Sequence, residues 1–287
     1  MKIFQCDVRR NWAFNALSEA TAQLIPIDDD RWQFTIGEES RLLVDAKVSD
    51  DWLILAAKYP ADRYGSESSW ETLGRNALLT GLAKLVLEGD GELGLHAEIP
   101  LVEGADLVGR IQEVQAGFKS VCFPAVIETG IDSSPAENER QPDLKSLCSE
   151  AGWVFTERSG GKFAVELEVP GSFYQAHLIP QHHGFRVTCE LMAFESVSEE
   201  TRQSIADLLL GASAFVRMTR ASVTTNQTAP VAQFEVVFGT APSPSELSSA
   251  LECLSTGCSL CGEEIKMLQT PAIAERYLAL RGWGADA

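Results

Sequence analysis

The sequence predicts an α+β protein built from two tandem copies of one module, in the order helix, three-strand meander, helix, two-strand hairpin, helix. Two observations favour this class. Within residues 68–101 the apolar pattern changes from helical spacing to strict alternation. The same succession of patterns returns after residue 143, which indicates a duplication.

The duplication divides the chain into domains. Residues 128–142 are polar and contain two prolines, a composition typical of a linker. We therefore predict a first domain at 1–127, a linker at 128–142 and a second domain at 143–287. A chain of 287 residues can bury two cores of ordinary size.

The stretch 68–101 defines the centre of the module. Ser68 and Glu71 have capping-box spacing, so a helix is expected to begin there. From Leu85 the apolar residues alternate, and Gly-Asp-Gly at 89–91 predicts a tight hairpin turn. The expected helix carries apolar residues at Trp70, Leu73, Leu78 and Leu82.

The rest of the first copy also shows helical spacing in some segments and strand alternation in others. An amphipathic helix is expected within 11–24, and Pro26 with the Asp28–Asp30 run ends it. After the hairpin, a helix is expected within 103–118. The three strands of the meander are expected at 31–37, 40–48 and 51–59.

The second copy is predicted by matching patterns. Trp153 is taken to correspond to Trp32, and the segment 208–216 aligns with 78–86 through a shared Leu-x-Gly. A last helix at 271–282 has no counterpart in the first copy. The segment 153–169 is expected to match the strands of 32–48. The other expected elements are a helix at 143–153, strands at 174–179, 185–192 and 231–239, and helices at 198–218 and 243–254.

The net charge of the chain indicates which classes of partner it can bind. The formal net charge is −18, and acidic residues outnumber basic ones in both halves. Binding to nucleic acid or to an anionic membrane surface relies on clustered Lys and Arg, so neither partner is expected. The acidity favours solubility and partners that are basic or of mixed charge.

Cysteine usage and the absence of apolar segments bear on location. Seven Cys without a disulfide-framework spacing suggest reduced thiols, as in a cytosol. Residues 1–14 lack the apolar core of a signal peptide, and no run approaches eighteen apolar residues. A cytoplasmic protein is expected.

Several of these features together resemble the type III secretion chaperone-like fold. They are the N-terminal helix, the meander, the helix W-x-x-L-x-x-N-A-L-L (Trp70 to Leu79), the hairpin ending A-E-I-P-L (Ala97 to Leu101) and the final helix. The chain is most similar to the bacterial YbjN-like branch and to the class of the Tir chaperone. The resemblance covers 11–118 well and 143–268 less well. The second half lacks counterparts of Trp70 and Asn76, and Phe238-Gly239 replaces the Ile-Pro ending.

The resemblance implies a non-enzymatic, acidic, cytosolic protein. Members of the family pair as dimers and bind an extended client segment across apolar surface patches, in some cases for secretion. Two such domains in one chain would form this pair internally, so a monomer is expected in solution.

The Cys, His and Asp clusters could form chemical sites, but each also has an explanation as ordinary core, turn or surface residues. Cys258 and Cys261, with Cys253 nearby, could form a redox pair or part of a metal site, but a zinc site needs four ligands and buried thiols fit a helix equally well. His177, His182 and His183 lie around a turn without Cys or Asp partners, and His96 alternates within a strand. Asp28–Asp30 and Asp50–Asp51 lack calcium-loop spacing.

The chain has no G-x-x-x-x-G-K-[ST] and no G-x-S-x-G motif. The stretch GDGELG (89–94) is interpreted as a tight hairpin turn, whose positive φ angles explain its glycines, and not as a nucleotide site. We therefore predict no catalytic residues, no cofactor and no metal. The first hypothesis is a protein that binds a partner polypeptide as a chaperone or adaptor. The alternatives are a scaffold or regulatory protein whose patches are closed by the second domain, and an enzyme of unrecognised type. The binding surface stays unassigned, although Trp12 or Trp70 could lie on it.

Overall fold

The computed structural model describes residues 2–37, 41–60, 68–89, 91–122, 144–158, 162–181, 184–195, 197–224 and 229–281. The predicted linker at 128–142 lies outside these ranges, as do Asp90 of the hairpin turn and His182 and His183. Side chains are described from residue 8 onward.

The described residues form two antiparallel sheets of six strands each, and the strand order is the same in both. Sheet A has the order β1-β2-β3-β4-β6-β5, and sheet B repeats it as β7-β8-β9-β10-β12-β11. The predicted α+β class is therefore confirmed. The strands of sheet A are β1 (Leu24–Pro26), β2 (Arg31–Ile36), β3 (Leu42–Ser49), β4 (Trp52–Lys58), β5 (Lys84–Leu87) and β6 (Leu93–Pro100). Those of sheet B are β7 (Phe155–Glu157), β8 (Phe163–Val169), β9 (Ser172–Gln181), β10 (Gly184–Ala193), β11 (Arg220–Thr224) and β12 (Val231–Phe238).

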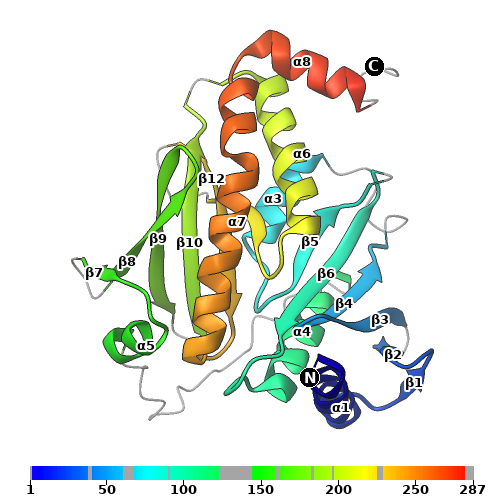
Figure 1. Cartoon of the computed structure of the whole chain (residues 1–287). Helices are drawn as coiled ribbons and strands as arrows, with labels where there is room; N and C mark the ends of the chain where they lie inside the picture. Colours follow the sequence, from blue (N-terminus) through cyan, green and yellow to red (C-terminus); the bar gives the residue numbers. More distant parts are fainter. Residues whose placement is uncertain are drawn as a thin grey trace, which may run out of the picture.

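Helices cover one face of each sheet and fill the space between the sheets (Figure 1). Alternate residues of β2, β3, β4 and β6 bury their side chains beneath α1 and α4, and those of β8, β9, β10 and β12 do so beneath α7. The helices are α1 (Lys2–Ala20), α3 (Ser69–Asn76), α4 (Leu107–Cys122), α5 (Leu144–Glu150), α6 (Glu199–Phe215), α7 (Pro244–Leu268) and α8 (Pro271–Leu280).

Each meander contains four strands, so the predicted three-strand meander is wrong by one strand. The strand β1 has only three residues and includes a proline, and both features weaken its sequence signal. The predicted match between Trp32 and Trp153 fails for the same reason. Trp32 lies in β2, the second strand of its sheet, whereas Trp153 precedes β7, the edge strand of the other.

The central helix of the first half is shorter than predicted. The capping box of Ser68 and Glu71 is present, but α3 ends at Asn76, and Leu78 is 81% exposed in the turn that follows. Segment 78–86 is thus turn and strand, whereas 208–215 is helix. The shared Leu-x-Gly does not mark equivalent positions.

The sheets meet where their edge strands β5 and β11 approach each other, and side chains satisfy the backbone at this junction. Asn76 accepts the N–H of Leu85 (2.8 Å) and donates to the carbonyls of Leu85 (2.9 Å) and Ala221 (2.8 Å). Ser213 of α6 accepts the N–H of Ala221 (2.9 Å). Ser213 thus does in the second half what Asn76 does in the first.

Lys84, the first residue of β5, is fully buried at this junction. Its ammonium lies 2.8 Å from Glu98 of β6 and donates to the carbonyls of Ser213 (2.6 Å), Val216 (2.8 Å) and Thr219 (3.3 Å). Burial lowers the pKa of Lys84, and Glu98 opposes that shift. Three carbonyls of the second half therefore depend on a cation of the first.

Arg220, the first residue of β11, makes the reciprocal contact. Its Nε donates to Glu235 of β12 (2.9 Å), and its two terminal nitrogens donate to the carbonyls of Leu79 (2.7 Å), Ala83 (3.1 Å) and Gly81 (3.4 Å). Burial lowers the pKa of Arg220, opposed by Glu235. Each cation is thus paired within its own sheet and holds the turn before the hairpin of the other half.

Replacing Lys84 by methionine is expected to lower the free energy of unfolding by about 3–5 kcal/mol, because it leaves the buried carboxylate of Glu98 without its counter-charge and removes the ammonium donor from three carbonyls. Lys58 and Glu92 form a matched exposed pair at 3.9 Å, with Lys58 94% exposed. Lys58→Met should change stability by less than about 1 kcal/mol. Urea unfolding checks both, and equal losses would contradict the prediction.

Candidate binding site

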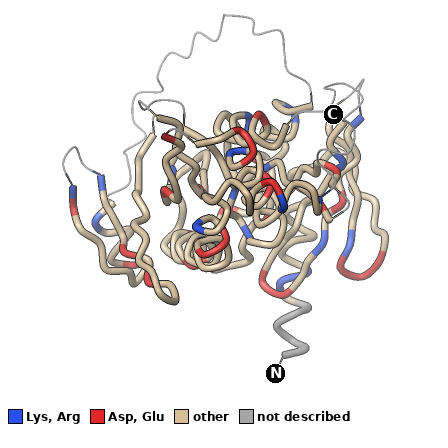
Figure 2. The backbone as a smooth tube through the Cα atoms, turned by 90° about the horizontal axis from the view of Figure 1, so that it is seen from above, with Lys and Arg blue, Asp and Glu red and all other residues tan. Residues whose placement is uncertain are grey.

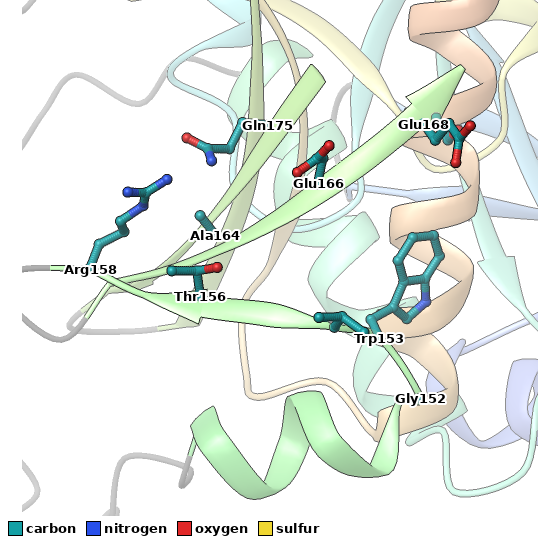
Figure 3. A pocket seen from close by; sticks show the side chains of 10 residues that line it. Gly152, Trp153, Thr156, Arg158, Ala164, Glu166, Glu168 and Gln175 are labelled. Atoms are coloured by element: carbon teal, nitrogen blue, oxygen red, sulfur yellow. The ribbon is translucent and has the colours of Figure 1, made fainter. Parts of the chain in front are cut away.

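An open cleft of about 690 Å³ lies at the β7 end of sheet B. In the view of Figure 3, Arg158 lies at one end, Trp153 and Glu168 lie at the other, and Gln175 and Glu166 lie between them. The cleft is lined by Gly152, Trp153, Val154, Thr156, Arg158, Ala164, Glu166, Glu168, Gln175 and Ser255.

The cleft exists because β7 is much shorter than the strand beside it. β8 pairs with β9 along its whole length from Phe163 to Val169, but β7 pairs with β8 only as far as Val165, which lies opposite Phe155. Before Phe155 the chain turns away through Val154 and Trp153, and the indole N–H donates to Ser248 of α7 (3.1 Å). Residues 166–169 of β8 therefore have no paired residue of β7 on this side.

The hydrogen-bond pattern shows which backbone groups face the cleft. The N–H of Arg158 donates to the carbonyl of Lys162 (2.7 Å), and opposite residues in antiparallel strands alternate between bonded and non-bonded pairs. The even-numbered residues of β8 therefore direct their backbone groups toward β7. Among the residues that the structure describes, no strand lies beside Glu166 and Glu168 on that side.

The outer edge of sheet A differs. The N–H of Ile27 donates to the carbonyl of Arg31 (2.9 Å), so the same alternation turns Leu24 and Pro26 of β1 outward. Proline has no N–H, so this edge offers few donors to a further strand. The other two sheet edges, β5 and β11, meet at the junction. The free edge of β8 is therefore the better place for an added strand.

A second hollow, of about 220 Å³, lies between α6, α7 and α8 and is almost wholly apolar. Met267 of α7, and Ile273 and Leu280 of α8, line it and are each at least 44% exposed. Its volume is enough for one or two side chains. The hollow is lined by Leu208, Glu264, Met267, Leu268, Ile273, Arg276, Tyr277 and Leu280.

The cysteines singled out by the sequence are core residues. Cys253, Cys258 and Cys261 are buried on α7, and the near neighbour of Cys258 is Cys189 of β10, with the two sulfur atoms 3.4 Å apart. Burial raises the pKa of both Cys253 and Cys261 to about 12. In the described parts of the chain, no group of three or more His, Cys, Asp or Glu could hold a metal ion.

The histidines and tryptophans considered in the sequence analysis lie at separate places in the structure. His96 contacts Glu88 (3.0 Å), and His177 lies in β9 opposite Thr188. Trp70 packs edge-on against Phe194 (ring centroids 4.8 Å apart) and beneath the guanidinium of Arg202, and Trp12 is half-buried against the core. Trp153 lines the cleft beside β8.

The positions of Asp and Glu are spread along the backbone of both halves (Figure 2). No described helix is long and apolar enough to cross a membrane. The sequence matches no protein-family model and no curated protein.

Glu166 and Glu168 were not among the residues that the sequence indicated. Their alternation within FAVELEV places them correctly on the exposed face of a strand. The open edge beside them depends on where β7 ends, and no local pattern fixes that end. The short segment FTE (β7) followed by Arg-Ser-Gly-Gly is the one signal that could have suggested an incomplete hairpin.

The free edge predicts a contrast in amide hydrogen exchange. The N–H groups of Glu166 and Glu168 face the cleft, whereas those of Val165 and Leu167 face β9. We expect the first two to exchange roughly 100-fold faster, because only the second two need local opening. Exchange measured by NMR checks this, and equal protection of all four would show that the edge is covered.

The buried cysteines predict a slow thiol titration. The side chain of Cys6 is not described, so a Cys6→Ser variant isolates the other six, all of which are buried. We expect no fast reaction with an aromatic disulfide reagent at neutral pH, because buried thiols with raised pKa values supply little thiolate. All six should react in denaturant. A fast native reaction of Cys258 or Cys261 would favour the redox pair instead.

Proposed function

We propose that this chain is a non-enzymatic polypeptide-binding protein, acting as a chaperone or adaptor, and that a client segment adds as a strand to the free edge of β8. The observation that carries the proposal is the pair of outward-facing backbone positions at Glu166 and Glu168, next to an open cleft. An extended peptide recognises such an edge through its main chain, and side-chain pockets add selectivity.

The cleft has the features that strand addition requires. Val154 is 90% exposed at its entrance, and the half-buried Trp153 indole forms a wall beside α7. A client strand would pair with the backbone of Glu166 and Glu168 and pack against these two residues. Each backbone hydrogen bond would contribute about 0.5–1.5 kcal/mol, so the apolar wall must supply part of the affinity.

We also propose that the two halves are copies of one secretion chaperone-like module and that the chain is a monomer containing an internal pair. Three features support this: the same strand order in both sheets, the equivalent roles of Asn76 and Ser213, and the reciprocal roles of Lys84 and Arg220. A mass of 31.2 kDa in light scattering would agree with the internal pair, and a stable dimer would not.

A scaffold or regulatory role is the second candidate, and the junction is the observation that favours it. The edges of β5 and β11 are closed by Asn76, Ser213 and each other, so the faces that meet at the junction cannot also hold a client. Under this alternative the β8 edge would bind no peptide.

The test uses short unconstrained peptides selected from an unbiased library against the wild-type protein. Selected peptides should slow exchange of the Glu166 and Glu168 amides and leave Val165 and Leu167 unchanged. Glu166→Pro should weaken binding about tenfold relative to Glu166→Gln, because both variants lose the carboxylate but only proline loses the N–H, worth about 1.4 kcal/mol. Equal binding by the two variants, or protection elsewhere, would contradict strand addition at this edge.

A further inference from the structure

We propose that the β8 cleft selects an extended segment carrying a Lys or Arg side chain, which lies over Glu166 and Glu168 and against the Trp153 indole. This inference rests on the proposed strand addition and adds the chemical class of the client. It assigns a binding role to side chains, whereas strand addition alone uses only the backbone.

The first support is the charge of the lining. Glu166 and Glu168 project from the same face of β8, because they are two residues apart on a strand. Both side chains are exposed, and neither has a Lys, Arg or His nitrogen within 4.0 Å in the described part of the chain, whereas the buried carboxylates of Glu98, Glu235 and Glu246 are each paired with a cation. Two free carboxylates at one edge leave a local negative charge that a cation can neutralise.

The second support is the indole wall. The N–H of Trp153 is held by Ser248, which fixes one edge of the ring toward α7. In Figure 3 the six-membered ring points toward the end of β8 that carries Glu168. An aromatic face beside carboxylates suits an ammonium or guanidinium group, since cation–π attraction and ion pairing then act on one side chain.

Arg158 makes the two ends of the cleft differ in charge. Arg158 lies at the other end of the cleft from Trp153 and Glu168 (Figure 3). A basic client residue would be repelled there and attracted at the Trp153 end. The register of the client strand is therefore set by charge as well as by hydrogen bonds.

The test compares peptides selected on the wild-type protein with the same peptides in which citrulline replaces arginine. Citrulline has nearly the same shape without the charge. We expect the arginine forms to bind about tenfold more tightly at low salt and the preference to shrink as salt screens the charges. Glu166→Gln/Glu168→Gln should bring the two forms close to equal affinity.

A matched variant separates local from overall charge. Glu19→Gln/Glu275→Gln removes the same charge at exposed positions on α1 and α8, and it should keep the arginine preference. Selected peptides without basic residues, or equal affinities of the arginine and citrulline forms with the Glu166 and Glu168 amides still protected, would overturn the charge selection and leave strand addition standing. If no peptide protects those amides, strand addition itself fails.

Discussion

The junction of β5 and β11 depends on two buried cations, Lys84 and Arg220, each of which bonds to both halves of the chain. A buried charge is tolerated only when a counter-charge and enough hydrogen-bond acceptors surround it. Lys84 and Arg220 find the counter-charge in their own sheet, at Glu98 and Glu235, but find most of their acceptors in the other half. Neither half can therefore satisfy its own central charge without the other, which makes the junction selective for this one arrangement.

The same junction also covers the unpaired backbone groups of two edge strands. Edge strands expose unpaired backbone groups that invite association with other chains. At β5 and β11 these groups are satisfied by Asn76 and Ser213, and Met218 adopts a left-handed conformation (φ 55°) in which its N–H reaches Glu98 (3.0 Å). Backbone strain at one residue is thus offset by a bond to the carboxylate that also holds Lys84.

Much of this could be predicted from residue patterns, because amphipathic periods and capping boxes are local. The Ser68 cap, the strand from Lys84 and the apolar face of α4 follow from spacing alone. The junction does not, because Lys84 and Glu98 look like ordinary exposed residues of a hairpin until the other half covers them. The strand alignment that matched Trp153 to Trp32 erred because identities in short strands are weaker constraints than strand order.

Glu166 and Glu168 at the free edge of β8 have two effects on an approaching strand. Charged side chains beside an unpaired strand discourage a second copy from adding there, because its own Glu166 and Glu168 would be brought close to the first pair. The same charges attract a strand of opposite sign. Among the described residues, the β1 edge presents a proline and the β5 and β11 edges meet at the junction, whereas the β8 edge carries the charges of Glu166 and Glu168. An edge that repels its own copy while remaining open to a basic segment has the properties that a binding protein needs.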